Sequence, residues 1–276
     1  MNASRKETLR QLWGESAVEY RDHVKKFATH RRISLLLLSA LTRSPKSILD
    51  FGCGPGNSTR LLRKFFPEAH IVGIDSSPEM IRLAQSETDP GLNIAYRCSD
   101  LTSSEESGGS FDVIFCSNSL FHVDDKSQLL SRFQKILKPG GCVVFSMYEF
   151  LFQPQGDIGW PYAEAIADSL IPHVVEKLQG YGYPVVSRKE DREIFREIEL
   201  KDLFLARGLI VRCAGIIRIN RTWEERRSFF RIPSVAQEVF PNVPTEDVRR
   251  ALDSVSLDSV YPDQERNVYG FVAEMA

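Results

Sequence analysis

Three glycines at alternate positions, Gly52, Gly54 and Gly56, are the feature of this sequence best suited to holding a ligand. The apolar run 48–51 leads into them, and the polar residues 57–59 open a helical pattern. Glycine permits positive φ and lets a ligand approach bare backbone, while a helix N-terminus offers unpaired N–H groups. This order of strand, tight loop and helix start predicts a binding site for a polar ligand.

The spacing of the glycines narrows the kind of ligand. A phosphate-binding P-loop requires a Gly-Lys-Ser/Thr ending, and no lysine stands there, so that site is excluded. A dinucleotide fingerprint requires Gly-x-Gly-x-x-Gly. Counting from Gly52 or Gly54 puts Asn57 or Thr59 in place of the third glycine, which weakens the dinucleotide interpretation but leaves it open.

An acidic residue, Asp75, ends the next apolar run 19 residues beyond Gly56. A nucleoside cofactor that lies along the carboxyl ends of parallel strands presents its ribose diol there, and one carboxylate can accept both hydroxyl hydrogens. Because the same acid serves nicotinamide enzymes, Asp75 predicts a nucleoside but does not identify the rest of the cofactor.

The elements around these residues alternate between strand and helix from residue 46 to 150, which predicts a parallel sheet with helices on both faces. Residues 1–45 are expected to form an N-terminal helical cap, and residues 151–197 an insertion or lid. Residues 198–276 would complete the sheet, with a helical insertion at about 223–260. Strands are expected at 47–51, 70–74, 94–98, 111–116, 142–147, 210–219 and 267–273, and helices at 4–42, 58–66, 78–86, 127–137, 161–178 and 199–207.

The wording of several motifs resembles the class I S-adenosylmethionine-dependent methyltransferases. Asp50-Phe51-Gly52-Cys53-Gly54-Pro55-Gly56 matches their motif I, Phe111 to His122 resembles motif IV, and Leu137-Lys138-Pro139-Gly140-Gly141 matches their L-x-P-G-G turn. The resemblance covers about residues 46–150 and is closest to the trans-aconitate and malonyl-carrier-protein carboxyl methyltransferase group. It implies a Rossmann-like, doubly wound, seven-stranded α/β sheet whose last strand is antiparallel.

The resemblance also implies S-adenosyl-L-methionine as cofactor and S-adenosyl-L-homocysteine as product. Motif I would wrap the methionine end, Asp100 would accept the adenine amine, and Leu101 would pack on the adenine ring. The implied cofactor-binding residues are Asp50, Gly52, Cys53, Gly54, Gly56, Asp75, Ser76, Met80, Asp100, Leu101, Ser117 and Asn118.

Methyl transfer from a sulfonium mainly requires an aligned nucleophile and, for some acceptors, a base. His122 is the candidate general base, because it follows the fourth strand and imidazole titrates near neutral pH. An acceptor carboxylate needs no base, so a substrate contact or a packing role for His122 stays open. The candidate substrate-contacting residues are Tyr20, Phe121, His122, Arg218 and Arg221.

The expected function is methyl transfer to a small molecule, most simply to an oxygen of a carboxylate or hydroxyl. Methylation of carbon or nitrogen in a secondary metabolite, a nicotinamide-dependent oxidoreductase, and a catalytically silent cofactor-binding regulator remain alternatives. The formal charge of −2 disfavours nucleic-acid binding. No residue spacing predicts a metal site, and no apolar run predicts membrane insertion. Five cysteines without a CxxC pair favour a cytoplasmic protein, and the sequence indicates no oligomeric state.

Overall fold

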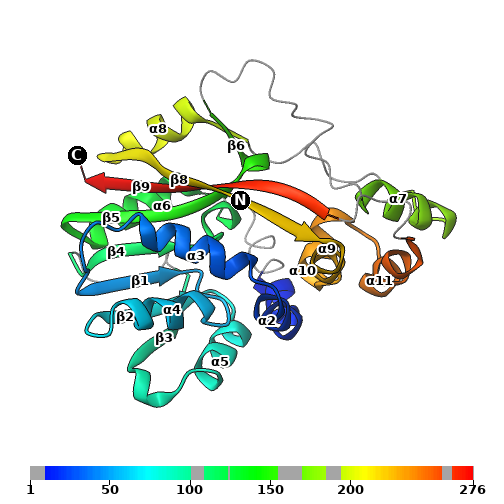
Figure 1. Cartoon of the computed structure of the whole chain (residues 1–276), viewed down its shortest axis with the longest axis horizontal. Helices are drawn as coiled ribbons and strands as arrows, with labels where there is room; N and C mark the ends of the chain where they lie inside the picture. Colours follow the sequence, from blue (N-terminus) through cyan, green and yellow to red (C-terminus); the bar gives the residue numbers. More distant parts are fainter. Residues whose placement is uncertain are drawn as a thin grey trace.

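The computed structural model describes residues 10–100, 109–123, 125–154, 170–184, 194–256 and 263–275, without the side chains of Phe121 and Asp263. Its main sheet has seven strands in the order β3-β2-β1-β4-β5-β9-β8 (Figure 1). The strands β1 to β5 pair in parallel, and β9 pairs antiparallel with both β5 and β8. These strands are β1 (Ser47–Phe51), β2 (His70–Asp75), β3 (Ile94–Cys98), β4 (Phe111–Cys116), β5 (Leu137–Tyr148), β8 (Leu209–Thr222) and β9 (Asp263–Met275). The predicted Rossmann-like α/β sheet with an antiparallel last strand is confirmed.

Both faces of the sheet are buried, as the apolar runs predicted. Consecutive strand residues belong to opposite clusters: Ile48 packs with Leu37 and Leu62, whereas Leu49 packs with Phe133 and its neighbours. The first cluster lies under α3 (Thr29–Ser39) and α4 (Asn57–Phe65), and the second under α6 (Lys126–Ile136) and α8 (Glu197–Leu205). The helix α5 (Pro78–Ser86) packs against β2 and β3. A parallel sheet covered in this way reads as continuous apolar runs.

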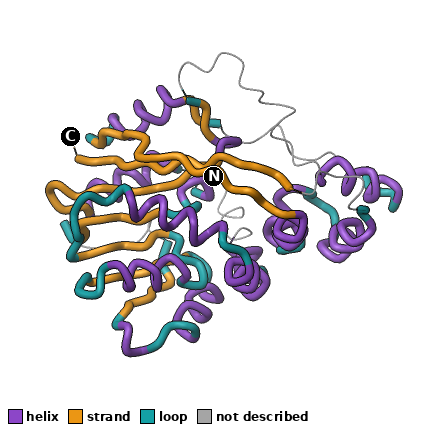
Figure 2. Tube along the Cα trace, viewed as in Figure 1, coloured by secondary structure: helices purple, strands orange, loops and turns teal. Residues whose placement is uncertain are grey.

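The strands β8 and β9 are longer than the sequence predicted, and the extra length carries a helical lobe. The pairing of β8 with β9 continues to Thr222 and Asp263, whereas that of β5 with β9 stops at Val268. Beyond that point lie α7 (Leu170–Gly180), α9 (Trp223–Phe230), α10 (Pro233–Val239) and α11 (Thr245–Ser254), which share one apolar cluster (Figure 2). We refer to these four helices as the helical lobe. A separate two-stranded sheet of β6 (Phe152–Gln153) and β7 (Phe195–Arg196) packs on the main sheet through Phe152, whose ring centroid lies 4.9 Å from that of Phe271.

The N-terminal segment is broken where the sequence predicted a continuous helix over 4–42. Residues 10–15 are helical, α2 spans Ala17–Lys26, and the extended backbone of Phe27 separates it from α3. The helix α2 packs against α5 of the core and α9 of the helical lobe. The first part of the helix expected over 161–178 lies outside the described residues, and α7 packs against α11. The lid role expected of residues 151–197 stays a prediction.

Across the described part of the chain, no helix combines the length and the apolar character that crossing a membrane would require.

Candidate active site

The glycine loop after β1 has the backbone that its glycines predicted. Gly52, Gly54 and Gly56 all have positive φ, at 68°, 51° and 81°. A Cβ added to Gly52 would lie 2.4 Å from the Cβ of Ser119, so this glycine is also required by packing. Ser119 in turn donates its hydroxyl hydrogen to the Phe51 carbonyl at 2.6 Å. The loop is therefore fixed against the end of β4 as well as being accessible to a ligand.

Asp75 joins the glycine loop to the end of β2. Its Oδ2 accepts the Gly54 N–H at 3.0 Å, and its Oδ1 accepts the Ser77 N–H at 2.9 Å. Burial raises the pKa of Asp75 although these N–H groups oppose the shift. Each carboxylate oxygen keeps a second lone pair, so Asp75 can still accept hydrogens from a diol.

Asp50, the penultimate residue of β1, has one carboxylate oxygen that accepts hydrogen bonds from described residues and one that does not. Its Oδ2 accepts hydroxyl hydrogens from Ser58 at 2.9 Å and Thr59 at 2.6 Å. Its Oδ1 is buried without a hydrogen-bond partner among the described residues. Burial raises its pKa from 3.8 to about 6 against these two hydrogen bonds. A buried bare oxygen of this kind fits a site completed by a ligand with a donor group.

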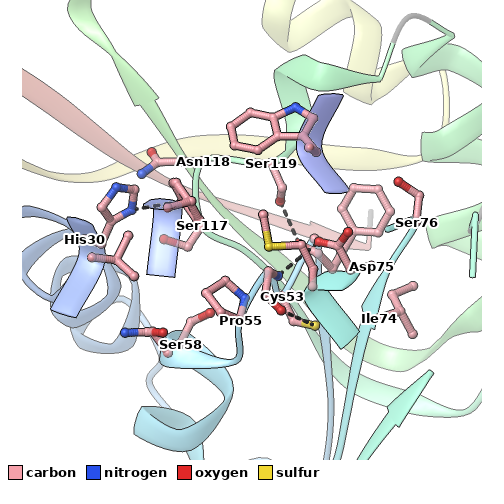
Figure 3. Close-up of a pocket in the computed structure, with 18 of the residues that line it drawn as sticks. His30, Cys53, Pro55, Ser58, Ile74, Asp75, Ser76, Ser117, Asn118 and Ser119 are labelled. Atoms are coloured by element: carbon pink, nitrogen blue, oxygen red, sulfur yellow. Dashed lines mark hydrogen bonds between the residues drawn. The ribbon is translucent and has the colours of Figure 1, made fainter. Parts of the chain in front are cut away.

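A cavity of about 950 Å³ lies over the glycine loop (Figure 3). Asp75, Ser76 and Ile74 lie at one end, and His30 and Asn118 lie at the other (Figure 3). The outer wall comes from residues of the N-terminal segment, including Trp13, Tyr20, Val24, Lys25 and Ser34. The described residues that line the cavity belong to segments 10–34, 51–64, 74–80, 98–100 and 117–123.

Four aromatic rings form a continuous chain along this cavity, which we call the aromatic wall: His122, Trp13, Tyr20 and His30. Successive ring centroids are 5.4 Å apart at each step, and the rings meet edge to face, at interplanar angles of 75° to 83°. Edge-to-face contacts are a favoured aromatic geometry. The wall connects the exposed His122 to the interior end of the cavity at His30.

A cationic group lies behind the His30 end of the wall. Burial and the nearby charge of Arg221 lower the pKa of His30 to about 4. Burial, His30 and Arg221 together lower the pKa of His23 to about 3. Arg221 is itself buried, stacks over the Phe229 ring at 4.8 Å, and has a buried Nε without a partner among the described residues. Both histidines are therefore neutral at pH 7.

Comparison with known proteins agrees with this geometry. A domain family described as "Methyltransferase domain" matches residues 48–141. Trans-aconitate 2-methyltransferase of Methylobacterium nodulans is 36% identical over 119 residues, covering 43% of this chain and 45% of the relative. Phosphoethanolamine N-methyltransferase 1 of Arabidopsis thaliana is 38% identical over 105 residues, 37% of this chain and 21% of the relative. The YcgJ protein of Bacillus subtilis shares the fold, with a TM-score of 0.58 at 16% identity over 89% of this chain and 98% of its own.

Residues 48–141 of the chain carry a methyltransferase domain of the class I S-adenosylmethionine-dependent type. The match spans about half the length of the trans-aconitate relatives, at 45% and 53%. S-adenosylmethionine is the cofactor of this class, and the residues of this methyltransferase fit it. The cavity has an acid for a diol at Asp75, and beside the loop lies the bare Oδ1 of Asp50, which suits an ammonium group.

Most of the predicted site residues of this methyltransferase meet at the cavity. The lining includes Gly52, Cys53, Gly54, Asp75, Ser76, Met80, Asp100, Ser117 and Asn118 of the predicted cofactor set, and Tyr20 and His122 of the predicted substrate set. Asp50 and Gly56 support the loop from beneath without lining the cavity. Leu101 and the Phe121 side chain lie outside the described residues.

Neither of the two arginines predicted to contact substrate lines the cavity. Arg218 is exposed and pairs with Glu265 at 3.5 Å, and it does not line the cavity. Arg221 lies on the inner side of the same strand, behind His30. Its charge lowers the pKa of His30, which lines the cavity, but the Arg221 side chain itself does not line it. Residues three apart on a strand point to opposite faces, which separates this pair.

His30 is the lining residue that sequence reasoning missed. In one unbroken helix a spacing of seven residues would place His23 and His30 on the same face, but the break at Phe27 puts them on two helices, with ring centroids 6.2 Å apart. Arg31 and Lys64 also line the cavity as exposed cations. Nothing in the local sequence distinguishes these cations from solvated surface charges.

Proposed function

We propose that this methyltransferase transfers a methyl group from S-adenosylmethionine to an oxygen atom of a small molecule, either a carboxylate or a hydroxyl oxygen. The cofactor supplies an electrophilic methyl group. With the cofactor bound, a bond would form between the acceptor oxygen and the methyl carbon as the carbon–sulfur bond broke, and sulfur would keep the electron pair. The protein must orient the acceptor and exclude water.

The charge distribution around the cavity is the observation that supports an oxygen acceptor. Among the described lining residues the only acids are Asp75 and Asp100. Asp75 ends β2 and Asp100 follows β3, at the end of the cavity where we place the nucleoside, which we call the nucleoside end. At the opposite end the wall is aromatic and amidic, with the Arg221 cation behind it. Such a surface is complementary to an anion or a hydroxyl and offers no carboxylate to a protonated amine.

The aromatic wall provides two positions from which side chains can act on an acceptor. His122 lines the outer part of the cavity and is held edge-on against Trp13. It can accept the proton of a hydroxyl acceptor, whereas an ionised carboxylate requires no base. The roles of Tyr20 and Phe121 as substrate contacts remain part of this proposal, and Tyr20 lines the cavity.

The test is to identify the product. The purified protein is incubated with S-adenosylmethionine carrying a labelled methyl group and a panel of small carboxylic acids, phenols and amines, and methylated products are identified by mass spectrometry. A methyl ester or methyl ether is the expected product. Methylated amines alone would contradict the proposed oxygen acceptor, and cofactor binding without any transfer would favour a regulatory protein.

A further inference from the structure

The inner end of the cavity presents two side chains whose hydrogen-bonding directions are fixed by their neighbours. Figure 3 shows His30 and Asn118 together at this end, opposite Asp75 and Ser76. His30 comes from α3 and Asn118 from the residues just after β4. A ligand that enters past the glycine loop would meet both.

The amide of Asn118 is oriented by one serine. The Asn118 backbone N–H donates to the Ser146 hydroxyl at 3.0 Å, and that hydroxyl donates to Asn118 Oδ1 at 2.9 Å. The amide oxygen is therefore directed to Ser146, and the Nδ2 group is left as the free end. This Nδ2 is buried and has no partner within the described residues. A buried bare donor of this kind is suited to an acceptor group supplied by a ligand.

Tyr20 is the hydrogen-bond partner on which the tautomer of His30 depends. The Tyr20 hydroxyl lies 3.5 Å from His30 Nδ1. Burial, with the charges of Tyr148 and Asp75, raises the pKa of Tyr20 far above its ordinary value, so its O–H is available as a donor. A neutral imidazole that accepts at Nδ1 carries its hydrogen on Nε2. His30 then becomes a second donor at this end of the cavity.

The groups packed around His30 favour an anion over a cation. Arg221 and His23 lie behind the ring, and Ser228 contacts His23 Nδ1 at 3.0 Å. Tyr148 lies near Arg221 and near the buried acid Glu225, and the charge of Glu225 helps to raise the pKa of Tyr148. Of these charged groups, Arg221 is the one that acts on His30.

We propose that His30 Nε2–H and Asn118 Nδ2–H form a two-donor subsite that holds the acceptor carboxylate, with Tyr20 fixing the His30 tautomer, and that this pair selects carboxylates over amines. This inference rests on the proposed oxygen methylation and specifies which residues would determine the acceptor. In it His30 and Asn118 are specificity-determining residues, and Tyr20 and Ser146 are positioning residues. Neither Nε2–H of His30 nor Nδ2–H of Asn118 can accept a hydrogen, so an ammonium group would gain no hydrogen bond from this pair.

The first test measures binding with shape-matched probes. Protein saturated with S-adenosylhomocysteine is titrated calorimetrically with benzoate, benzyl alcohol and benzylamine. The expected order of affinity is benzoate, then benzyl alcohol, then benzylamine. Asn118→Asp keeps the Ser146 contact but replaces the donor by a carboxylate oxygen, and it should weaken benzoate about 10- to 100-fold while benzylamine binds better. Aspartate tolerates the Asn118 backbone, whose φ is 58°.

Asn93→Asp is the matched control for this variant. Asn93 also has positive φ, at 49°, and lies exposed outside the cavity lining, so its replacement adds the same charge without touching the subsite. It should leave the benzoate-to-benzylamine ratio unchanged. Each of three results would overturn the proposal. The benzoate-to-benzylamine ratio could be unchanged in Asn118→Asp, the unsubstituted protein could bind benzylamine as tightly as benzoate, or it could fail to bind benzoate.

The second test observes the tautomer directly. Nitrogen-15 NMR of the complex with S-adenosylhomocysteine should show His30 protonated at Nε2 and bare at Nδ1, and Tyr20→Phe should lose this preference. His30→Gln, which can restore a donor, should recover benzoate binding better than His30→Leu. A hydrogen on Nδ1 would contradict the subsite. If methyl esters form but Asn118→Asp leaves the benzoate-to-benzylamine ratio unchanged, the subsite is wrong and the proposed oxygen methylation stands. If the protein discriminates between the probes but transfers no methyl group, the proposed oxygen methylation is wrong.

Discussion

The two ends of the cavity are built by different means: the end at Asp75, to which we assign the nucleoside, and the end at His30 and Asn118, to which we assign the methyl acceptor. At the nucleoside end, Asp75 accepts two backbone N–H groups, and the glycine loop takes its shape from positive φ and from Ser119. At the acceptor end, side chains from two N-terminal helices meet edge to face. Backbone geometry can be shared by every protein that binds one nucleoside, whereas side chains on separate helices can vary with the acceptor.

This comparison predicts that the nucleoside end tolerates no added atom at Gly52. Gly52→Ala combines a left-handed backbone with a Cβ 2.4 Å from Ser119 Cβ, and should lower the free energy of unfolding by about 3 to 4 kcal/mol. Gly140→Ala is the control, because its φ is 75° and nothing lies within 4 Å of the added Cβ. Urea denaturation of both variants separates the clash from the backbone strain. Equal losses would show that Ser119 packing contributes nothing.

The buried Asp50 predicts a pH-dependent stability of the same region. A carboxyl whose pKa rises from 3.8 to about 6 on folding stabilises the fold when protonated, and that contribution disappears as pH rises from about 4 through 6. The full loss is ~3 kcal/mol above pH 7. Asp50→Asn should remove this slope in urea unfolding measured at pH 4.5 and pH 7.5. The exposed Asp22→Asn corrects for one lost charge, and an equal slope in Asp50→Asn would contradict the assignment.

At the acceptor end, His122 should matter for one acceptor class only. His122→Phe preserves an aromatic contact for Trp13 but cannot accept a proton. The rate of methyl transfer to a phenol should fall about 100-fold, while transfer to a carboxylate should not change. Both rates are followed as S-adenosylhomocysteine formed. Parallel losses for both acceptors would mean that His122 shapes the cavity and carries no proton.

The smallest expected effect concerns Asp75, the carboxylate proposed to accept hydrogen bonds from the ribose diol. Asp75→Asn keeps one oxygen but loses the charge, so S-adenosylhomocysteine should bind about tenfold more weakly in calorimetry. Asp89→Asn serves as the comparison, since Asp89 is exposed, caps the short 3-10 helix Pro90–Leu92 and does not line the cavity. Unaltered affinity in Asp75→Asn would remove the carboxylate from cofactor recognition.

The nucleoside end was predictable from sequence because its determinants are local. The helix α5 begins at Pro78 as predicted, since Ser77 caps it and proline suits a first helical position. The strand β5 was predicted too short, because Leu137 pairs with Phe111 ahead of the glycine turn. These are errors of boundary in an otherwise correct sheet.

The acceptor end was less predictable because it depends on where helices and strands turn. The break at Phe27 redirects α3 and brings His30 to the cavity. The helical spacing of the apolar residues does not predict this break. Arg218 and Arg221 could be told apart only by knowing which face of β8 points inward. Tertiary arrangement decides these positions, and the local pattern does not contain it.

The position of α2 has a consequence for the binding and release of ligands. Residues of this helix close the cavity, while the helix itself contacts α5 on one side and α9 of the helical lobe on the other. We expect the release of a substrate bound behind Tyr20 to become faster when these contacts loosen. Turnover would then depend on how tightly the lobe holds α2, so a substitution in α9 far from the reacting atoms could change the rate of product release.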